Sequence, residues 1–293
     1  MLPHHIQGFR RLADVVLDAF NELRGEGSTH ALGTGLSELD SRIGGFRRGD
    51  LVVVSGPTGA GKSSFVRSVV TDAILRSDAA IRFFSPEASA EILFLRAVSA
   101  LAGVDSSRID LGDLRGTESS RVDEALGVLR QSRLRVHHRM PMTADDIYAS
   151  CVAAQSGSPL DLVAVDYLQL LRDRNETGDD RWSDSVRDLK ALARELDVPV
   201  LVVSQLNAET SSHATTVVPE YRRDIPYTLA QAADVIIMLA PFSDIRLSQS
   251  QLDHDTHLTT VMVVKNHHGP LASAMLRFLP ETGAFRSVAD RVA

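Results

Sequence analysis

From residue 33 onward, short and continuous apolar runs alternate with longer stretches of helical periodicity. Five runs are prominent: LVVVS (51–55), IRFFS (81–85), DLVAVD (161–166), PVLVVS (199–204) and DVIIML (234–239). Their Val, Ile and Leu content without polar alternation is typical of parallel strands that helices cover on both faces. The pattern therefore predicts an α/β fold with a mostly parallel sheet.

The two ends of the chain follow other patterns. HLTTVMVVK (257–265) and LASAMLRFL (271–279) are joined by a short turn, which predicts a β-hairpin. Residues 4–24 carry apolar side chains at helical spacing between charges and predict an amphipathic helix. The flexible stretch GEGS (25–28) follows it, so we expect residues 1–29 to form a helix with its connection and residues 30–293 the main domain. The helix either packs on its own domain or docks, as an arm, on a neighbouring subunit.

Composition narrows the class of protein. A chain of 293 residues with 44% hydrophobic residues can bury a substantial core. Its net charge of −7 excludes a generally basic surface, so any contact with nucleic acid must be local. A single cysteine and no secretory signal indicate a cytoplasmic protein. The apolar runs are far shorter than the ~20 residues that span a bilayer, so we expect no membrane segment.

A glycine-rich stretch, GPTGAGKS (56–63), lies directly after the first strand and before a predicted helix. Its glycines allow backbone N–H groups to surround a phosphate, and the helix N-terminus adds a positive dipole end. Lys62 would reach the β and γ oxygens, and Ser63 would offer its hydroxyl to Mg²⁺. The candidate nucleotide-binding residues here are Gly56, Pro57, Thr58, Gly59, Ala60, Gly61, Lys62, Ser63 and Ser64.

Three polar residues follow other predicted strands, at the sheet edge where open α/β proteins bind ligands. Asp166 ends the run DLVAVD and is the candidate second group for Mg²⁺. Glu87 is the candidate general base; the alternative is an ordinary first-turn glutamate favoured by the helix dipole. Gln205 is placed to read a γ-phosphate by hydrogen bonding. Together they predict nucleotide hydrolysis.

Several separated motifs resemble the C-terminal motor domain of DnaB-type replicative helicases. They are TGLSELDSRIGGFRRGDLVVVSGPTGAGKSSF, FFSPEASAEILFLRAVSALAGVD, LVAVDYLQLL, LKALARELDVPVLVVSQLN and KNHHGP, in this order. The resemblance covers roughly residues 30–290. The pair DYLQL and VVSQLN points to this family within the RecA-like group. RadA-like and KaiC-like ATPases share the opening TGLSELDSRIGG and are the nearest alternatives.

The resemblance implies a RecA-like fold assembled as a hexameric ring, with ATP and Mg²⁺ at each subunit interface and single-stranded DNA in the central channel. It assigns to Lys62, Ser63, Glu87, Asp166 and Gln205 the roles given above. The family's channel loops correspond here to LLRDRNETGDDR and TTVVPEYRRDIPYTLAQAAD. Candidate DNA contacts are therefore Arg172, Arg174, Arg222 and Arg223, with a solvated loop charge as the alternative for each.

The sequence departs from the family pattern in two places. The family has a helical N-terminal collar domain that recruits primase, whereas this chain starts at what resembles the linker helix. We therefore expect a loader or primase in a separate chain. In the segment VVKNHHGP, Lys265 matches the family's basic pair, but His267 occupies the arginine-finger position.

Histidine is a weaker substitute for an arginine finger, which contributes about 10³ to 10⁵ in turnover, because it is only partly protonated at neutral pH. Metal binding by His267 and His268, or an ordinary exposed turn, are the alternatives at this segment. The sequence thus predicts a DNA helicase driven by ATP hydrolysis. The competing functions are an ATPase that remodels or loads a nucleoprotein complex without unwinding, and an assembly switch gated by nucleotide.

Overall fold

The computed structural model describes residues 31–86, 88–172, 182–205, 225–241 and 257–288. All of them belong to one unit of the chain, Ala31–Ala293. The predicted helix at 4–24 lies outside the described residues, as do Glu87, Arg174, Arg222 and Arg223. What the sequence analysis predicts for them stays a prediction.

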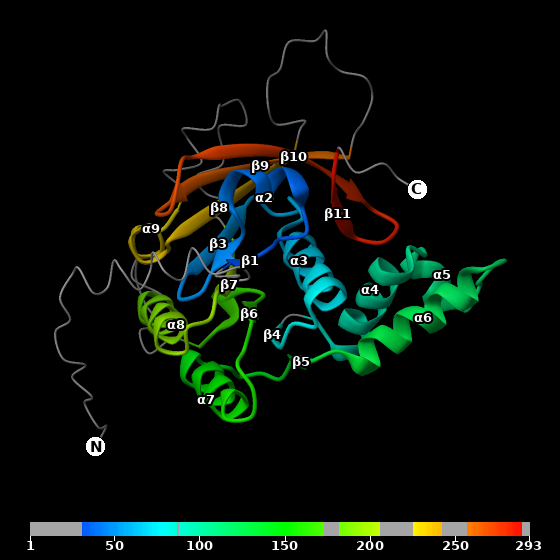
Figure 1. The fold of residues 1–293 in the computed structure, drawn as a ribbon, viewed down its shortest axis with the longest axis horizontal. Helices are drawn as coiled ribbons and strands as arrows, with labels where there is room; N and C mark the ends of the chain where they lie inside the picture. The colour runs from blue at the N-terminus through cyan, green and yellow to red at the C-terminus, as the bar shows by residue number, and fades with distance from the viewer. Residues whose placement is uncertain (1–30, 87, 173–181, 206–224, 242–256, 289–293) are drawn as a thin grey trace, which may run out of the picture. The chain divides into compact units, whose positions relative to one another are not determined.

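A nine-stranded sheet forms the centre of this unit (Figure 1). Its strands are β3 (Leu51–Gly56), β4 (Ile81–Phe84), β5 (Leu134–His137), β6 (Leu162–Val165), β7 (Val200–Gln205), β8 (Val235–Pro241), β9 (Leu258–Asn266), β10 (Ala272–Leu279) and β11 (Ala284–Ser287). The order is β11-β10-β9-β8-β3-β7-β6-β4-β5. Strands β3 to β8 run parallel, and β9 to β11 are antiparallel. The α/β class, the five parallel strands and the C-terminal hairpin are thus confirmed. A separate small sheet pairs β1 (Ala31–Leu32) with β2 (Phe46–Arg47).

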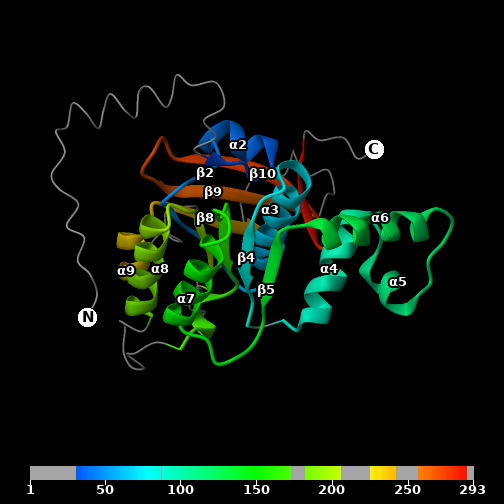
Figure 2. The same ribbon diagram turned by 60° about the horizontal axis from the view of Figure 1, so that its bottom comes forward.

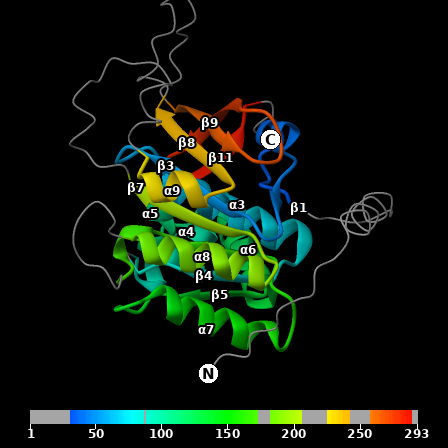
Figure 3. The same ribbon diagram turned by 90° about the vertical axis from the view of Figure 1, so that its left-hand side faces the viewer.

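Helices cover both faces of the sheet (Figures 2 and 3). They are α2 (Ser37–Ile43), α3 (Lys62–Ser77), α4 (Ala90–Ala102), α5 (Ser106–Leu111), α6 (Glu118–Gln131), α7 (Ala144–Gln155), the 3₁₀ helix η1 (Leu168–Leu170), α8 (Ser183–Glu195) and α9 (Tyr227–Ala232). One core packs α2, α3 and α4 on one face of the sheet, and a second core packs α7, α8 and α9 on the other. None of the helices described is long and apolar enough to cross a membrane.

Strand β3 explains why the sequence pattern was continuous. All six of its residues are buried, and side chains alternate between the two cores: Val52 and Val54 face one, and Leu51 and Val53 face the other. Because β3, β7 and β6 are adjacent and parallel, the residues that follow their carboxyl ends meet at one edge. The fold therefore brings the phosphate loop, Asp166 and Gln205 to one edge of the sheet.

Candidate functional site

The phosphate loop follows β3 and turns tightly into α3. Gly56 has φ 149°, and a Cβ atom there would lie 2.5 Å from the carbonyl oxygen of Leu239 on β8. Gly61 has φ 87°, and its Cβ would lie 2.8 Å from the ring of Phe285 on β11. Both contacts are too short for any side chain, and positive φ favours glycine. These two glycines are therefore required by the packing of the loop between β8, β11 and the helix.

Lys62 is the first residue of α3, and its side chain returns over the loop. Its ammonium donates hydrogen bonds to the carbonyl oxygens of Gly56 at 2.9 Å and Pro57 at 2.8 Å. The ammonium is therefore held over the loop that precedes α3. Its contact with the β and γ oxygens of a nucleotide stays a prediction.

Ser63 and Asp166 lie in direct contact, although 103 residues separate them. The Ser63 hydroxyl donates to Asp166 Oδ1 at 2.8 Å, and Asp166, which follows β6, is only 3% exposed. Hydroxyl and carboxylate oxygens are hard donors of the kind that Mg²⁺ prefers. The pair therefore fits a magnesium site beside the phosphate loop.

Gln205, at the end of β7, reaches the loop directly. Its side-chain Nε2 donates to Thr58 Oγ1 at 2.7 Å. Gln169 on η1 fixes this strand end: its Oε1 accepts from Gln205 N at 3.1 Å, and its Nε2 donates to Gln205 O and to Ser204 Oγ, both at 3.0 Å. Gln169 lies in the motif DYLQL, but its sequence pattern alone indicated no role for it.

A cavity of about 510 Å³ opens in front of the loop. Beyond the loop itself, it is lined by Arg67 from α3, Arg96 from α4, and Phe278, Pro280 and Thr282 from the end of β10 and the turn that follows it. Arg67 donates from Nη2 to Ser64 Oγ at 2.9 Å. These side chains were missed because none belongs to a phosphate-loop pattern. They extend the cavity beyond the loop, to a volume larger than a phosphate group fills.

The hairpin turn between β9 and β10 lies at the amino ends of the parallel strands, opposite the phosphate loop. Asn266 of β9 pairs with Val235 at the start of β8, so the turn is beside the amino ends of β8 and β3. The six residues of β3 separate this edge from the phosphate loop by roughly 20 Å, at ~3.3 Å per residue. Lys265 and His267 therefore lie far from the phosphate loop of their own chain.

Both candidate residues of the hairpin contact their own chain. The Lys265 ammonium donates to the carbonyl oxygens of Ala230 at 2.8 Å and Gln231 at 3.2 Å, near the end of α9. The His267 side chain is 51% exposed, and its Nδ1 lies 3.4 Å from Asp234 Oδ1. His267 thus remains available at the surface, while Lys265 is held against α9.

His268 points to a different carboxylate from its neighbour. Its Nε2 lies 2.8 Å and 2.9 Å from the two oxygens of Asp50, which is buried just before β3. Burial raises the pKa of Asp50, and the hydrogen bond and charge of His268 oppose that rise. Among the described residues, no three His, Cys, Asp or Glu side chains are placed to share a metal ion.

Asp234 forms the second buried pair of this edge. Its Oδ2 accepts from Leu51 N at 2.7 Å and from the ammonium of Lys190 on α8, which also donates to Gly49 O at 2.9 Å. Burial opposes ionisation of Asp234, but the hydrogen bonds from Lys190 and Leu51 outweigh it and lower its pKa. Neither buried pair was expected from the sequence.

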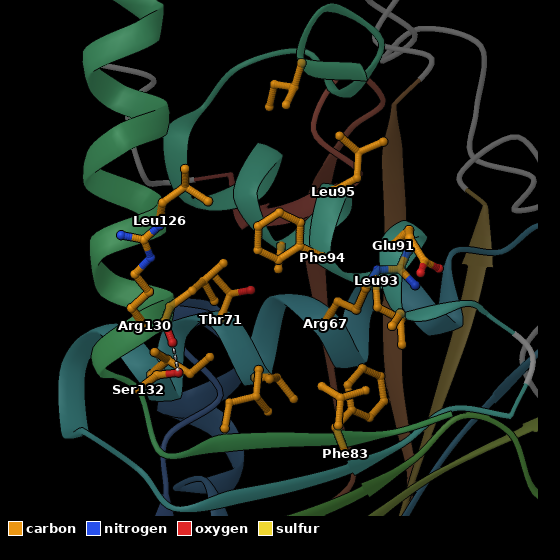
Figure 4. A pocket seen from close by; sticks show the side chains of 18 of the residues that line it. Arg67, Thr71, Phe83, Glu91, Leu93, Phe94, Leu95, Leu126, Arg130 and Ser132 are labelled. Atoms are coloured by element: carbon orange, nitrogen blue, oxygen red, sulfur yellow. Dashed lines mark hydrogen bonds between the residues drawn. The ribbon is translucent and has the colours of Figure 1, made fainter. Parts of the chain in front are cut away.

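A second, mostly apolar cavity of about 790 Å³ lies between α3, α4, α6 and the strands β4 and β5 (Figure 4). Phe94, which is 53% exposed, stands in its centre, with Leu126 and Arg130 on the α6 side. Arg67 and Glu91 line it away from α6. An apolar hollow of this size is suited to a bulky apolar ligand or a partner helix.

Of the candidate DNA contacts, only Arg172 is described. It is exposed, and its backbone N–H donates to Met142 O at 2.9 Å. The other three arginines and Glu87 lie outside the described residues. The DNA-binding and general-base assignments therefore stay predictions.

Fold and site together define a RecA-like domain with a phosphate loop. The chain belongs to the DnaB-like helicase C terminal domain family, which matches residues 31–287. It therefore contains the phosphate-loop ATPase domain of a DnaB-like helicase.

Relatives in this family include replicative helicases. The replicative DNA helicase DnaB of Geobacillus stearothermophilus is 25% identical, over 98% of this chain and 64% of that protein. The replicative DNA helicase DnaC of Bacillus subtilis (strain 168) is 25% identical, over 97% of this chain and 63% of that protein. This chain thus spans a little under two thirds of the length of these relatives.

Solved structures share the fold. A solved ATPase domain superposes with a TM-score of 0.83 at 22% identity, over 96% of this chain and 100% of that chain. A DnaB-like replicative helicase, described with its interactions with primase, superposes with a TM-score of 0.81 at 22% identity, over 94% of this chain and 68% of that chain.

Proposed function

We propose that this chain is a motor subunit that hydrolyses ATP with Mg²⁺, assembles into a hexameric ring, translocates on single-stranded DNA and unwinds duplex DNA in replication. One observation carries the proposal. Ser63, Asp166 and Gln205 converge beside the phosphate loop, whereas Lys265 and His267 lie at the other edge of the same sheet. A complete site therefore needs two copies of the chain.

In this proposal each residue of the loop edge has a separate task. Lys62 binds the β- and γ-phosphates, and Gln205 binds the γ-phosphate through its amide. Ser63 and Asp166 would hold Mg²⁺, which neutralises phosphate charge when bound. Glu87 accepts the proton of the attacking water.

The hairpin completes a neighbour's site. Because one edge of each subunit faces the opposite edge of the next, the contact is head-to-tail and closes into a ring when the rotation permits. His267 takes the place of the finger, and Lys265 leaves the α9 carbonyls to bind the neighbour's γ-phosphate. Single-stranded DNA then contacts Arg172, Arg174, Arg222 and Arg223 in the channel.

The apolar cavity around Phe94 supports a second contact between subunits. We propose that the amphipathic helix predicted at residues 4–24 of one subunit inserts its apolar face into this cavity of the next. Phe94→Glu should shift the sedimentation coefficient with ATP toward that of a monomer. Val152→Glu, which alters an exposed apolar residue on α7, should not. Equal effects of the two substitutions would contradict this contact.

Two measurements test the motor function. Glu87→Gln should reduce ATP turnover at saturating nucleotide and DNA by about a hundredfold or more, since general bases contribute about 10² to 10⁴. The unaltered protein should separate a forked DNA duplex, and Glu87→Gln should not. Unchanged turnover in Glu87→Gln would overturn the general-base assignment.

Two observations favour a second candidate, an ATPase that remodels or loads a nucleoprotein complex. His267 replaces the finger arginine, and the net charge is −7. Sustained turnover without strand separation would favour it. An assembly switch would instead change its sedimentation between ATP and ADP without sustained hydrolysis. In each case we propose that a loader or primase in a separate chain is the protein partner.

A further inference from the structure

Strand β5 is the edge of the sheet at the end opposite β11. Within the described residues it pairs only with β4, and Figures 1 and 2 show it beyond β4 at the border of the sheet. Its residues Arg135 and His137 are exposed, as are His138 and Arg139, which follow it directly. We name the set Arg82, Arg133, Arg135, Arg139, His137 and His138 the basic edge.

The register of the two strands places Arg82, Arg135 and His137 on one face of the sheet. Arg82 of β4 is directly paired with Arg135 of β5, and Phe84 with His137. Because side chains alternate, Arg133, Arg135 and His137 point to the same side, and the ring contact between Phe84 and His137 agrees with this. Burial, and the positive charges of Arg135 and Arg133, lower the pKa of Arg82. Like charges directly opposite one another destabilise a strand pair, so this arrangement has a cost.

No carboxylate of the described chain forms an ion pair with the basic edge. The polar partners of its arginines are the hydroxyl of Ser158 and the carbonyl oxygens of Ile81, Ser132 and Leu134. The carboxylates of Glu91 and Asp146 form no ion pair with His138 and His137: hydrogen bonds from Ser89 and Thr143 are the main cause that lowers their pKa, and the two histidines contribute less.

Several arginines elsewhere in the described chain are paired with carboxylates. Arg48, Arg76, Arg108, Arg115 and Arg187 each form an ion pair with an aspartate or a glutamate. The protein carries 38 acidic and 31 basic residues, so partners are plentiful. A row of guanidinium groups that no described carboxylate neutralises, in such a protein, indicates an anionic ligand that is not part of the chain.

We propose that the basic edge binds the phosphate backbone of single-stranded nucleic acid, at a site separate from the phosphate loop and from the predicted channel arginines. On an extended strand, residues two apart are about 7 Å apart at ~3.3 Å per residue, so Arg133, Arg135 and His137 form a linear series of cations. Such a series follows an extended chain of phosphates, and guanidinium groups bind phosphate with two parallel hydrogen bonds. The row itself contains no Phe, Tyr or Trp to stack bases, so recognition is independent of sequence and sensitive to salt.

Charge removal tests the proposal on the full chain. Binding of a fluorescent oligothymidylate is measured by anisotropy without ATP, over a series of salt concentrations. Arg135→Ala with Arg139→Ala should weaken binding about tenfold at low salt and reduce the slope of log Kd against log salt by about 1.4, at ~0.7 per phosphate contact. Replacing both by lysine should retain most of the affinity, because the charges remain. The matched control, Arg115→Ala with Arg187→Ala, removes two exposed arginines from elsewhere and should change neither quantity.

Two further readouts separate this site from others. Ultraviolet crosslinking of a 4-thiothymidine oligonucleotide should label the peptide that contains residues 133–139, and ATP turnover without DNA should be unchanged in the alanine variant. Unaltered oligonucleotide affinity in that variant, or no crosslink to this peptide, would overturn the proposal. Binding of a fluorescent polyglutamate peptide in preference to the oligonucleotide would also overturn it and assign the surface to an acidic protein partner.

Discussion

The phosphate loop and the hairpin turn lie at opposite ends of strand β3, and charged groups are paired differently at these two ends of the sheet. We call them the loop edge and the hairpin edge. At the loop edge, Lys62 donates to loop carbonyls and Asp166 accepts from a serine hydroxyl, beside a cavity of about 510 Å³. At the hairpin edge, the buried Asp50 and Asp234 are bound to His268 and Lys190 of the same chain.

This difference indicates that the loop edge binds a ligand and that the hairpin edge stabilises the fold. A ligand phosphate or a metal ion can take over these contacts at the loop edge, because the carbonyl and hydroxyl groups in them are neutral and the new bonds would join opposite charges. At the hairpin edge, removing a partner would leave a buried charge alone, which is costly. We therefore expect the loop edge to determine chemistry and the hairpin edge to determine stability and the position of His267.

The largest effect is expected at the loop edge. Lys62→Ala and Asp166→Asn should each reduce ATP turnover by about a hundredfold or more, because each removes a group that stabilises phosphate charge. Thermal unfolding of Asp166→Asn should change little, since Asn keeps the size of Asp. A coupled ATPase assay measures the loss, with the exposed Arg76→Ala as control. Turnover within threefold of the unaltered protein would remove the residue concerned from the site.

At the hairpin edge, the largest effect should be on stability. Lys190→Met leaves Asp234 buried without its cation and should lower the free energy of unfolding by about 3 kcal/mol. Urea denaturation followed by circular dichroism measures it. Arg187→Met, also on α8 but 68% exposed, is the control and should cost less than about 0.5 kcal/mol. If the two variants lose equal stability, the buried pair does not support this edge.

The comparison also explains which parts of the fold could be predicted. Strands buried on both faces, such as β3, give continuous apolar runs, and those were predicted. Strand β5 was missed because it is an edge strand whose Leu134 packs against the core while Arg135 and His137 are exposed. Strand β11 was missed because four residues are too few for a pattern.

The contacts of the site also divide into those that the sequence predicts and those that it does not. Ser63, Asp166 and Gln205 could be predicted to meet, because a phosphate loop fixes one strand end and parallel neighbours share that edge. The pair of His268 with Asp50 spans 218 residues, and no local spacing indicates it. It depends on the register of β9 on β8, which sequence alone does not determine.

A smaller effect should follow from breaking that pair. His268→Gln should lower the free energy of unfolding by about 1.5 kcal/mol at pH 5, because buried Asp50 loses its partner. The pKa of Asp50 is raised, so the ionised group costs stability above that pKa and the neutral group does not below it. His268 offsets this cost, and its contribution should shrink as the pH falls through the raised pKa of Asp50, so the loss is compared at about pH 5 and about pH 3. Urea denaturation at both pH values tests this, with the exposed His138→Gln as control. A loss that is the same at both pH values would mean that Asp50 is not the partner that matters.

The smallest effect should appear where the hairpin edge of one subunit meets the loop edge of the next. His267→Arg should raise DNA-stimulated ATP turnover about threefold or more at pH 8 and little at pH 6, because arginine keeps its charge across this range and histidine in general does not. His257→Arg, just before β9 at the strand's other end, is the control and should change turnover at neither pH. The contact with Asp234 limits the gain, since Asp234 holds the imidazole in its present position and a longer guanidinium must leave it to reach a neighbour. An equal increase at both pH values would mean that His267 does not act on the neighbour's nucleotide, and the hairpin would then serve its own subunit through Lys265 and His268 alone.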